Sequence, residues 1–155
     1  MKTKRNILSL KFPDHPVNVP IAKCAIRAFV MQANPTIETL NDITTAVEEA
    51  VSNAVEYAYP NSSGGEISVR AVLYDDNTLE ITVRDKGIGI KDIEKARSPL
   101  YTSSNGDCHV GLGFSVMENF MDSVSVRSNC FSYRPGTTVI LKKELGIKPI
   151  WVFPV

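Results

Sequence analysis

The chain has 155 residues, 43% hydrophobic and 22% charged, and its 17 Lys and Arg residues equal its 17 Asp and Glu residues in number. This length fits one domain of common size, and the zero net charge argues against direct nucleic-acid binding. No apolar run approaches the roughly 18 residues of a membrane span, and the N-terminus lacks the continuous apolar run of a signal peptide. We therefore expect one cytoplasmic domain over residues 1–155, with an uncertain C-terminal tail over 144–155.

The first elements in chain order are a strand and two helices. Residues 5–12 alternate between apolar and polar side chains, which is typical of a half-buried strand. Over residues 17–32 the apolar residues recur every three or four positions, the spacing of a helix. A longer apolar stripe runs from Ile37 to Ala58, and the proline, asparagine and glycines that follow it end this second helix.

The second half of the chain predicts two strand pairs and two short helices. Alternating apolar and polar residues predict one strand pair over 66–74 and 78–85 and another over 123–129 and 136–144. The two short helices are predicted over 90–98, after Asp85, and over 114–121, after Gly113. Residues 99–110 are polar and have no period of either kind. Strands grouped with helices on one side predict an α/β fold, a two-layer α/β sandwich whose mixed, mostly antiparallel sheet is covered by helices on one face.

The long second helix carries Glu49 and Asn53 four residues apart, and therefore on one face. A polar stripe on a helix is usually its solvated side. Inside a pocket, the amide oxygen of Asn53 would suit a hard cation such as Mg²⁺, and Glu49 could accept a proton from a hydroxyl or a water molecule. This pattern alone leaves both interpretations open.

Two glycine pairs flank the polar segment. Asp85 ends a strand, and Gly87 and Gly89 after it would let the backbone approach a flat ligand, although the same residues are found in ordinary turns. Gly111 and Gly113 precede a helix, whose exposed N–H groups could bind phosphate or could simply mark a tight entry into the helix.

Several other functions lack their signatures in this sequence. It contains no G-x-x-x-x-G-K-[ST] loop, no H-R-D or D-F-G kinase motif and no G-x-S-x-G elbow. The three cysteines, Cys24, Cys108 and Cys130, are odd in number and lack the spacing of metal ligands, which indicates reduced thiols and disfavours zinc. His15 and His109 are expected at the surface.

In this order and at this spacing, the segments together resemble the GHKL ATPase/kinase superfamily, which has the Bergerat ATP-binding fold. Within it, "EKARSPLYTS", "GLGFSVMENFMDSVSV" and "GTTVILKK" are similar to the anti-sigma-F factors, serine protein kinases of spore-forming bacteria. The resemblance covers about residues 5–143.

The resemblance implies ATP or ADP and Mg²⁺ as cofactors. It also implies a role for the polar residues of the second helix, for Asp85 and Thr138, and for the two glycine pairs. Asn53 would hold Mg²⁺, and Glu49 would be the general base for a serine hydroxyl of the protein substrate. Asp85 would bind the adenine amine with water-mediated support from Thr138. Gly87 and Gly89 would admit the adenine, and Gly111 and Gly113 would offer N–H groups to the phosphates.

By the same resemblance, residues 99–110 would form a lid over ATP. Ser104 and His109 stand where relatives carry Lys and Arg, and a histidine is mostly neutral near pH 7, so we expect weaker phosphate clamping and slower kinase turnover.

The resemblance also implies protein partners. These are a sporulation sigma factor that is sequestered, an anti-anti-sigma protein that is phosphorylated on serine, and a second copy in a homodimer. Lys23 matches a position at which relatives use an arginine in partner docking. Three alternatives remain: a general-stress anti-sigma kinase, an ATP-dependent binding module with weak or no catalysis, and a detached histidine-kinase catalytic domain.

Overall fold

The fold is known from a computed structural model that describes residues 2–61, 64–98, 112–131 and 133–146. Nine elements follow one another in these residues, and every strand and helix expected from the sequence has a counterpart: β1 (Lys4–Pro13), α1 (Asn18–Met31), α2 (Ile37–Tyr57), β2 (Glu66–Tyr74), β3 (Thr78–Asp85), α3 (Ile93–Arg97), α4 (Gly113–Phe120), β4 (Ser123–Asn129) and β5 (Gly136–Glu144).

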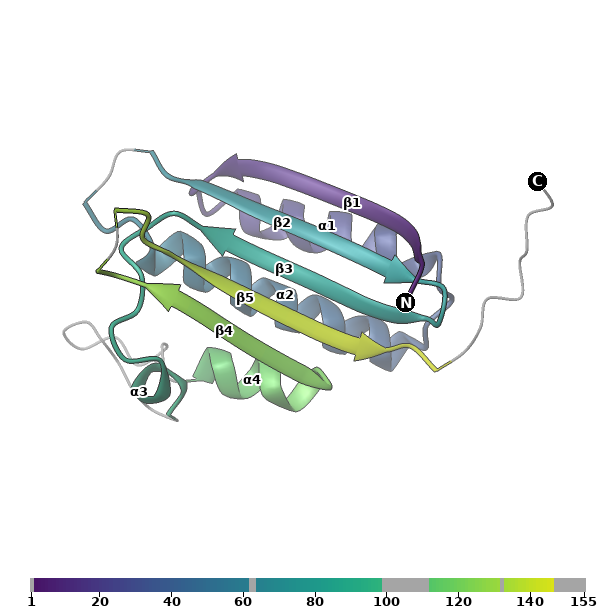
Figure 1. Ribbon diagram of the computed structural model, residues 1–155. Coiled ribbons are helices and arrows are strands. Elements are labelled where there is room, and N and C mark those ends of the chain that lie inside the picture. The colour runs from purple at the N-terminus through teal and green to yellow at the C-terminus, as the bar shows by residue number, and fades with distance from the viewer. Residues whose placement is uncertain (1, 62–63, 99–111, 132, 147–155) are drawn as a thin grey trace.

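The strands form one five-stranded sheet in the order β1-β2-β3-β5-β4, and Figure 1 shows helices α1, α2 and α4 on one face of it. All four neighbouring pairs are antiparallel, where the sequence had suggested a mixed, mostly antiparallel sheet. The reason is the insertion of β5 between β3 and β4. Because β5 separates them, β4 runs in the same direction as β3 without pairing with it. We call the helix-free side the open face.

Helix α2 is the centre of the helical layer. Its 21 residues span about 31 Å, and its first turn is capped by Thr36, whose side chain accepts a hydrogen bond of 3.1 Å from the Thr39 N–H. The buried side is lined by an apolar stripe at helical spacing, which packs on the sheet. The same spacing leaves the neighbouring side of α2 free to carry polar groups at the edge of the core.

Helix α4 packs against α2 through side chains that enter the same core. Phe114 and Met117 are buried, and Met121 follows as the last buried residue before β4. Met117 has no exposed surface, so it fixes the distance between the two helices.

The ends of two expected elements differ from the sequence-based prediction. Helix α3 begins at Ile93, because the Asp92 side chain caps it by accepting a 3.0 Å hydrogen bond from the Lys95 N–H. The first two residues of the tail expected over 144–155 belong to the fold. Glu144 is the last residue of β5, and Leu145 is buried and donates its N–H to the Asn77 carbonyl. Across the described ranges, none of the helices has the length and apolar character needed to cross a membrane.

The substitution Met117→Ala tests the packing of α4 on α2. We expect a loss of about 2–5 kcal/mol in the free energy of unfolding, because the change leaves a cavity at a fully buried position. The control is Ile37→Ala, whose side chain is 76% exposed and should change stability by less than about 0.5 kcal/mol. Urea denaturation compares the two; equal losses would show that α4 is not part of the core.

Candidate functional site

Glu49 and Asn53 lie on α2 at the border between its buried and exposed sides. Both side chains are partly exposed, while Val47, Ala50 and Val51 around them are buried. This placement follows from the sequence, since the residues are four apart and the apolar stripe passes beside them. A carboxylate and a carboxamide are thus held side by side on a rigid helix.

Gly113, the first residue of α4, lies directly against these two side chains. A Cβ atom built on Gly113 would be 3.0 Å from Asn53 Nδ2 and 3.1 Å from Glu49 Oε2. The backbone of Gly113 is helical and would accept any residue, so the glycine is explained by this contact and not by its conformation. The N-terminus of α4, where the partial positive charge of the helix lies, therefore meets Glu49 and Asn53.

The surroundings of Glu49 raise the pKa of its carboxyl. Burial, and after it the negative charge of neighbouring Glu48, raises the pKa of the Glu49 carboxyl above its ordinary value. A carboxylate with a raised pKa is a stronger base than one in water.

A second group of residues surrounds Asp85 at the end of β3. Asp85 is only 6% exposed, and its Oδ1 accepts hydrogen bonds from the Gly87 N–H at 2.9 Å and the Thr137 N–H at 3.1 Å. Burial raises the pKa of the Asp85 carboxyl, against the opposing effect of these two hydrogen bonds. Both donors meet Oδ1, which leaves Oδ2 as the oxygen that can accept from a ligand.

The loop after Asp85 is held against the end of α2. A Cβ atom on Gly87 would overlap the carbonyl of Ala58, and the same carbonyl accepts a 2.9 Å hydrogen bond from the Ile88 N–H. A Cβ atom on Gly89, whose φ is 75°, would likewise overlap the carbonyl of Asn129. Ala58 is five residues beyond Asn53, about 7.5 Å along the helix. One helix thus positions both groups.

Thr138, expected to support Asp85, is on the wrong face of β5. Thr138 pairs with Arg84, and since side chains alternate along a strand, both belong to the open face, opposite Asp85. The neighbouring Thr137 lies on the helical face, as Val139 and Leu141 do. Thr137 donates its N–H to Asp85, so the expectation for Thr138 is corrected to Thr137. The alternation of Leu141 and Val139 already carried this signal in the sequence.

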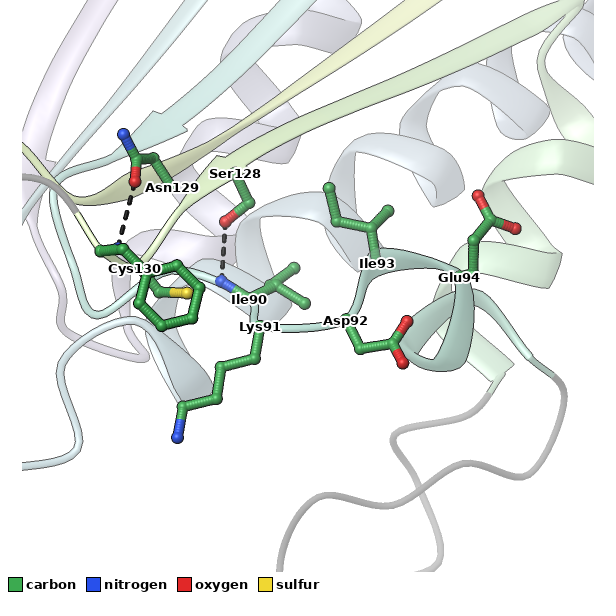
Figure 2. A pocket seen from close by; sticks show the side chains of 9 residues that line it. Ile90, Lys91, Asp92, Ile93, Glu94, Ser128, Asn129 and Cys130 are labelled. Carbon is green, nitrogen blue, oxygen red and sulfur yellow. Dashed lines mark hydrogen bonds between the residues drawn. The ribbon is translucent and has the colours of Figure 1, made fainter.

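Two further residues near Asp85 were not predicted from the sequence. Ser128 accepts a hydrogen bond from the Ile90 N–H at 2.7 Å, drawn in Figure 2, and its hydroxyl lies 2.8 Å from that of Thr137. The Tyr59 hydroxyl accepts from the Lys86 N–H at 2.7 Å. These side chains fix the glycine loop through its backbone, and such contacts have no recognisable sequence pattern.

Beside this loop lies a cavity of about 340 Å³, lined by residues 90–94 and 128–131. Glu49 and Asn53 are not among its lining residues, so it flanks the candidate site and does not contain it. Gly111, Ser104, His109 and the predicted lid over 99–110 lie outside the described residues.

Lys23, the predicted docking residue, is on α1 and forms an ion pair with Glu48 of α2. Its side chain is 36% exposed, so it can be reached from solvent. Glu48 directly precedes Glu49, which places Lys23 near the candidate site.

Comparison with known proteins gives one consistent family. Residues 12–143 match the model of the histidine kinase-like ATPase domain. Two curated relatives are anti-sigma F factors: one from Geobacillus kaustophilus is 43% identical over 92% of this chain and 94% of its own, and one from Pasteuria penetrans is 46% identical over 92% and 93%.

Solved structures share the fold at lower identity. The RsbU and RsbW domains of a Mycobacterium tuberculosis protein superpose with a TM-score of 0.67 at 19% identity, over 96% of this chain and 35% of that one. The catalytic domain of histidine kinase ThkA gives 0.52 at 16% identity, over 89% and 96%. The fold, the family model and the level of identity agree that the chain belongs to the anti-sigma F factor family, within the histidine kinase-like ATPase domains.

Proposed function

We propose that the chain is an anti-sigma factor that inhibits a sporulation sigma factor and uses ATP to phosphorylate an anti-anti-sigma protein on serine. The observation that carries the proposal is the contact of Glu49 and Asn53 with Gly113, at one end of a site whose other end is Asp85. At one end such a site has a proton acceptor, a cation ligand and a helix N-terminus. At its other end it has a carboxylate that can bind the adenine of the nucleotide.

The residues around Asn53 fit a bound Mg²⁺. Asn53 offers a neutral oxygen of the kind that Mg²⁺ takes, and the missing side chain of Gly113 leaves space beside it that a Cβ atom would fill. Bound there, Mg²⁺ would neutralise charge on the ATP phosphates. Asn53 would hold the ion, and the N-terminal N–H groups of α4, with Gly111 before them, would face the phosphates.

Glu49 would act as the general base. The serine hydroxyl of the substrate loses its proton to the Glu49 carboxylate as its oxygen forms a bond to the γ-phosphorus, and the bond from that phosphorus to ADP breaks. Transfer therefore falls as the pH is lowered through the pKa of Glu49, which burial raises above its ordinary value.

At the other end of the site, Asp85 would accept a hydrogen bond from the exocyclic amine of adenine through Oδ2. Thr137 and Ser128, whose hydroxyls lie 2.8 Å apart, would support it from β5 and β4. Gly87 and Gly89 would admit the adenine ring by shaping the loop beside it, since their missing side chains let this loop pack against the carbonyls of Ala58 and Asn129.

The protein would act as a cytoplasmic homodimer of single-domain chains and dock its partners partly through Lys23. The ion pair with Glu48 supports this role, since an exposed lysine with a single acidic partner can exchange it for an acidic group of a docking protein.

The first prediction on the mechanism concerns Glu49→Gln. We expect phosphoserine on the anti-anti-sigma protein to fall at least about 100-fold, because the proton acceptor is lost. Binding of Mg·ATP should stay within a few-fold of the unchanged chain. Labelled ATP and calorimetry measure the two quantities.

The matched control for that experiment is Glu56→Gln, an exposed glutamate on the same helix, which should leave both quantities unchanged. Undiminished labelling in Glu49→Gln would remove Glu49 from this role. An acid-labile product would indicate a histidine kinase, and ATP binding without any transfer by the unchanged chain would indicate a binding module.

A second prediction separates the two threonines of β5. Thr137→Val should weaken ADP binding by about two- to thirteenfold, the effect of one lost hydrogen bond of roughly 0.5–1.5 kcal/mol. Thr138→Val should leave it unchanged, because Thr138 is on the open face. Isothermal titration compares the two variants, and the reverse order would restore the original assignment to Thr138.

A further inference from the structure

Three arginines gather on the open face at the end of the sheet where β3 ends and β5 begins. Arg84 of β3 and Arg127 of β4 both pair with Thr138 of β5, so they stand on either side of it. Adjacent strands are about 4.8 Å apart, which places the two arginine backbones roughly 10 Å from one another. Arg134 precedes β5 at the same end.

These arginines line a cavity of about 220 Å³ together with Thr138 and Asn129, and Asp85 and Ser128 also border it. Arg84 and Thr138 contribute to it from the open face, because residues 84 and 138 alternate with 85 and 137 along their strands. We call Arg84, Arg127 and Arg134, with the cavity between them, the basic end of the open face.

The positive charges of Arg84 and Arg127 are poorly neutralised by the residues that the structure describes. Within the described part of the chain, neither Arg84 nor Arg127 forms a salt bridge with an acidic side chain. Glu66, the first residue of the neighbouring strand β2, pairs with two lysines instead, since its carboxylate lies within 4.0 Å of both Lys11 and Lys86. Guanidinium groups in this position favour a ligand with carboxylates, which match their planar fork.

Two aromatic side chains project from the turn next to these arginines. Phe131 is 87% exposed and Tyr133 is 90% exposed, and the Arg134 guanidinium lies over the Tyr133 ring at 5.5 Å from its centre. Exposed Phe, Tyr and Arg side chains in one place are the composition of a protein-binding hot spot. A small free anion would leave both rings uncovered.

We propose that the basic end of the open face binds an acidic segment of a partner protein. Carboxylates of the segment pair with Arg84 and Arg127 across Thr138, and an apolar side chain of the segment covers Phe131 and Tyr133. A nucleic acid is disfavoured by the zero net charge of the chain, whose 17 basic residues are matched by 17 acidic ones. The cavity of this surface borders Asp85 and Ser128 of the proposed nucleotide site, but the binding of an acidic segment does not depend on the proposed kinase activity.

The test uses a fluorescent synthetic peptide of alternating Glu and Leu residues and the full chain. We expect saturable binding that weakens with added salt, and an affinity at least about tenfold lower in Arg84→Gln/Arg127→Gln. The matched control is Lys4→Gln/Arg5→Gln, which removes the same charge from β1 at the other edge of the sheet and should bind as the unchanged chain does. Circular dichroism confirms that both variants are folded.

A second variant, Phe131→Ala/Tyr133→Ala, tests the apolar contact and should also weaken the peptide at least about fivefold, with an unchanged salt dependence. Equal losses in the control variant would overturn the proposal, since only bulk charge would then matter. So would tighter binding of a DNA duplex than of the peptide. A change in oligomeric state in Arg84→Gln/Arg127→Gln with unchanged peptide affinity would assign the face to contacts between copies of the chain, and would equally overturn it.

Discussion

The close contact of Gly113 with Glu49 and Asn53 is the constraint on which the arrangement of the site depends. It brings the N-terminus of α4 close to two polar side chains on α2, and a Cβ atom at this position would require their ends to shift by a few tenths of an ångström. The contact places a carboxylate, a carboxamide and the positive end of a helix in one corner.

Helix α2 connects this corner to the second part of the site. Asn53 faces α4, and one and a half turns later the carbonyl of Ala58 receives the loop of Gly87 and Ile88. The buried stripe of α2 fixes both to the sheet, and β5 brings Thr137 to the same carboxylate that holds Gly87. The residues proposed to bind the two ends of the nucleotide are therefore positioned by one rigid helix, and the sheet supplies Asp85 and Thr137.

Much of this arrangement could be predicted from sequence, for reasons visible in particular residues. Periodicity identified α2 and the strands, and the spacing of Glu49 and Asn53 placed them on one face. The insertion of β5 between β3 and β4 is a long-range pairing that no local pattern encodes, and the sheet expected to be mixed and mostly antiparallel is antiparallel at all four pairs. Thr138 was chosen although alternation from Leu141 and Val139 selects Thr137. Ser128 and Tyr59 act through backbone groups of the glycine loop, and their contacts appear only once the strands are assembled.

The central claim is that Gly113 is a glycine because of its contact with the side chains of Glu49 and Asn53 and not because of its conformation. The most direct measurement compares Gly113→Ala with Gly64→Ala, at which a Cβ atom would meet nothing within 4 Å. We expect both variants to keep the melting temperature of the unchanged chain within a few degrees, and Gly113→Ala alone to lose Mg·ATP affinity and phosphoryl transfer, each by about tenfold or more, because the new methyl group displaces Asn53 and Glu49. Unchanged affinity and transfer in Gly113→Ala would contradict the account, whatever its stability.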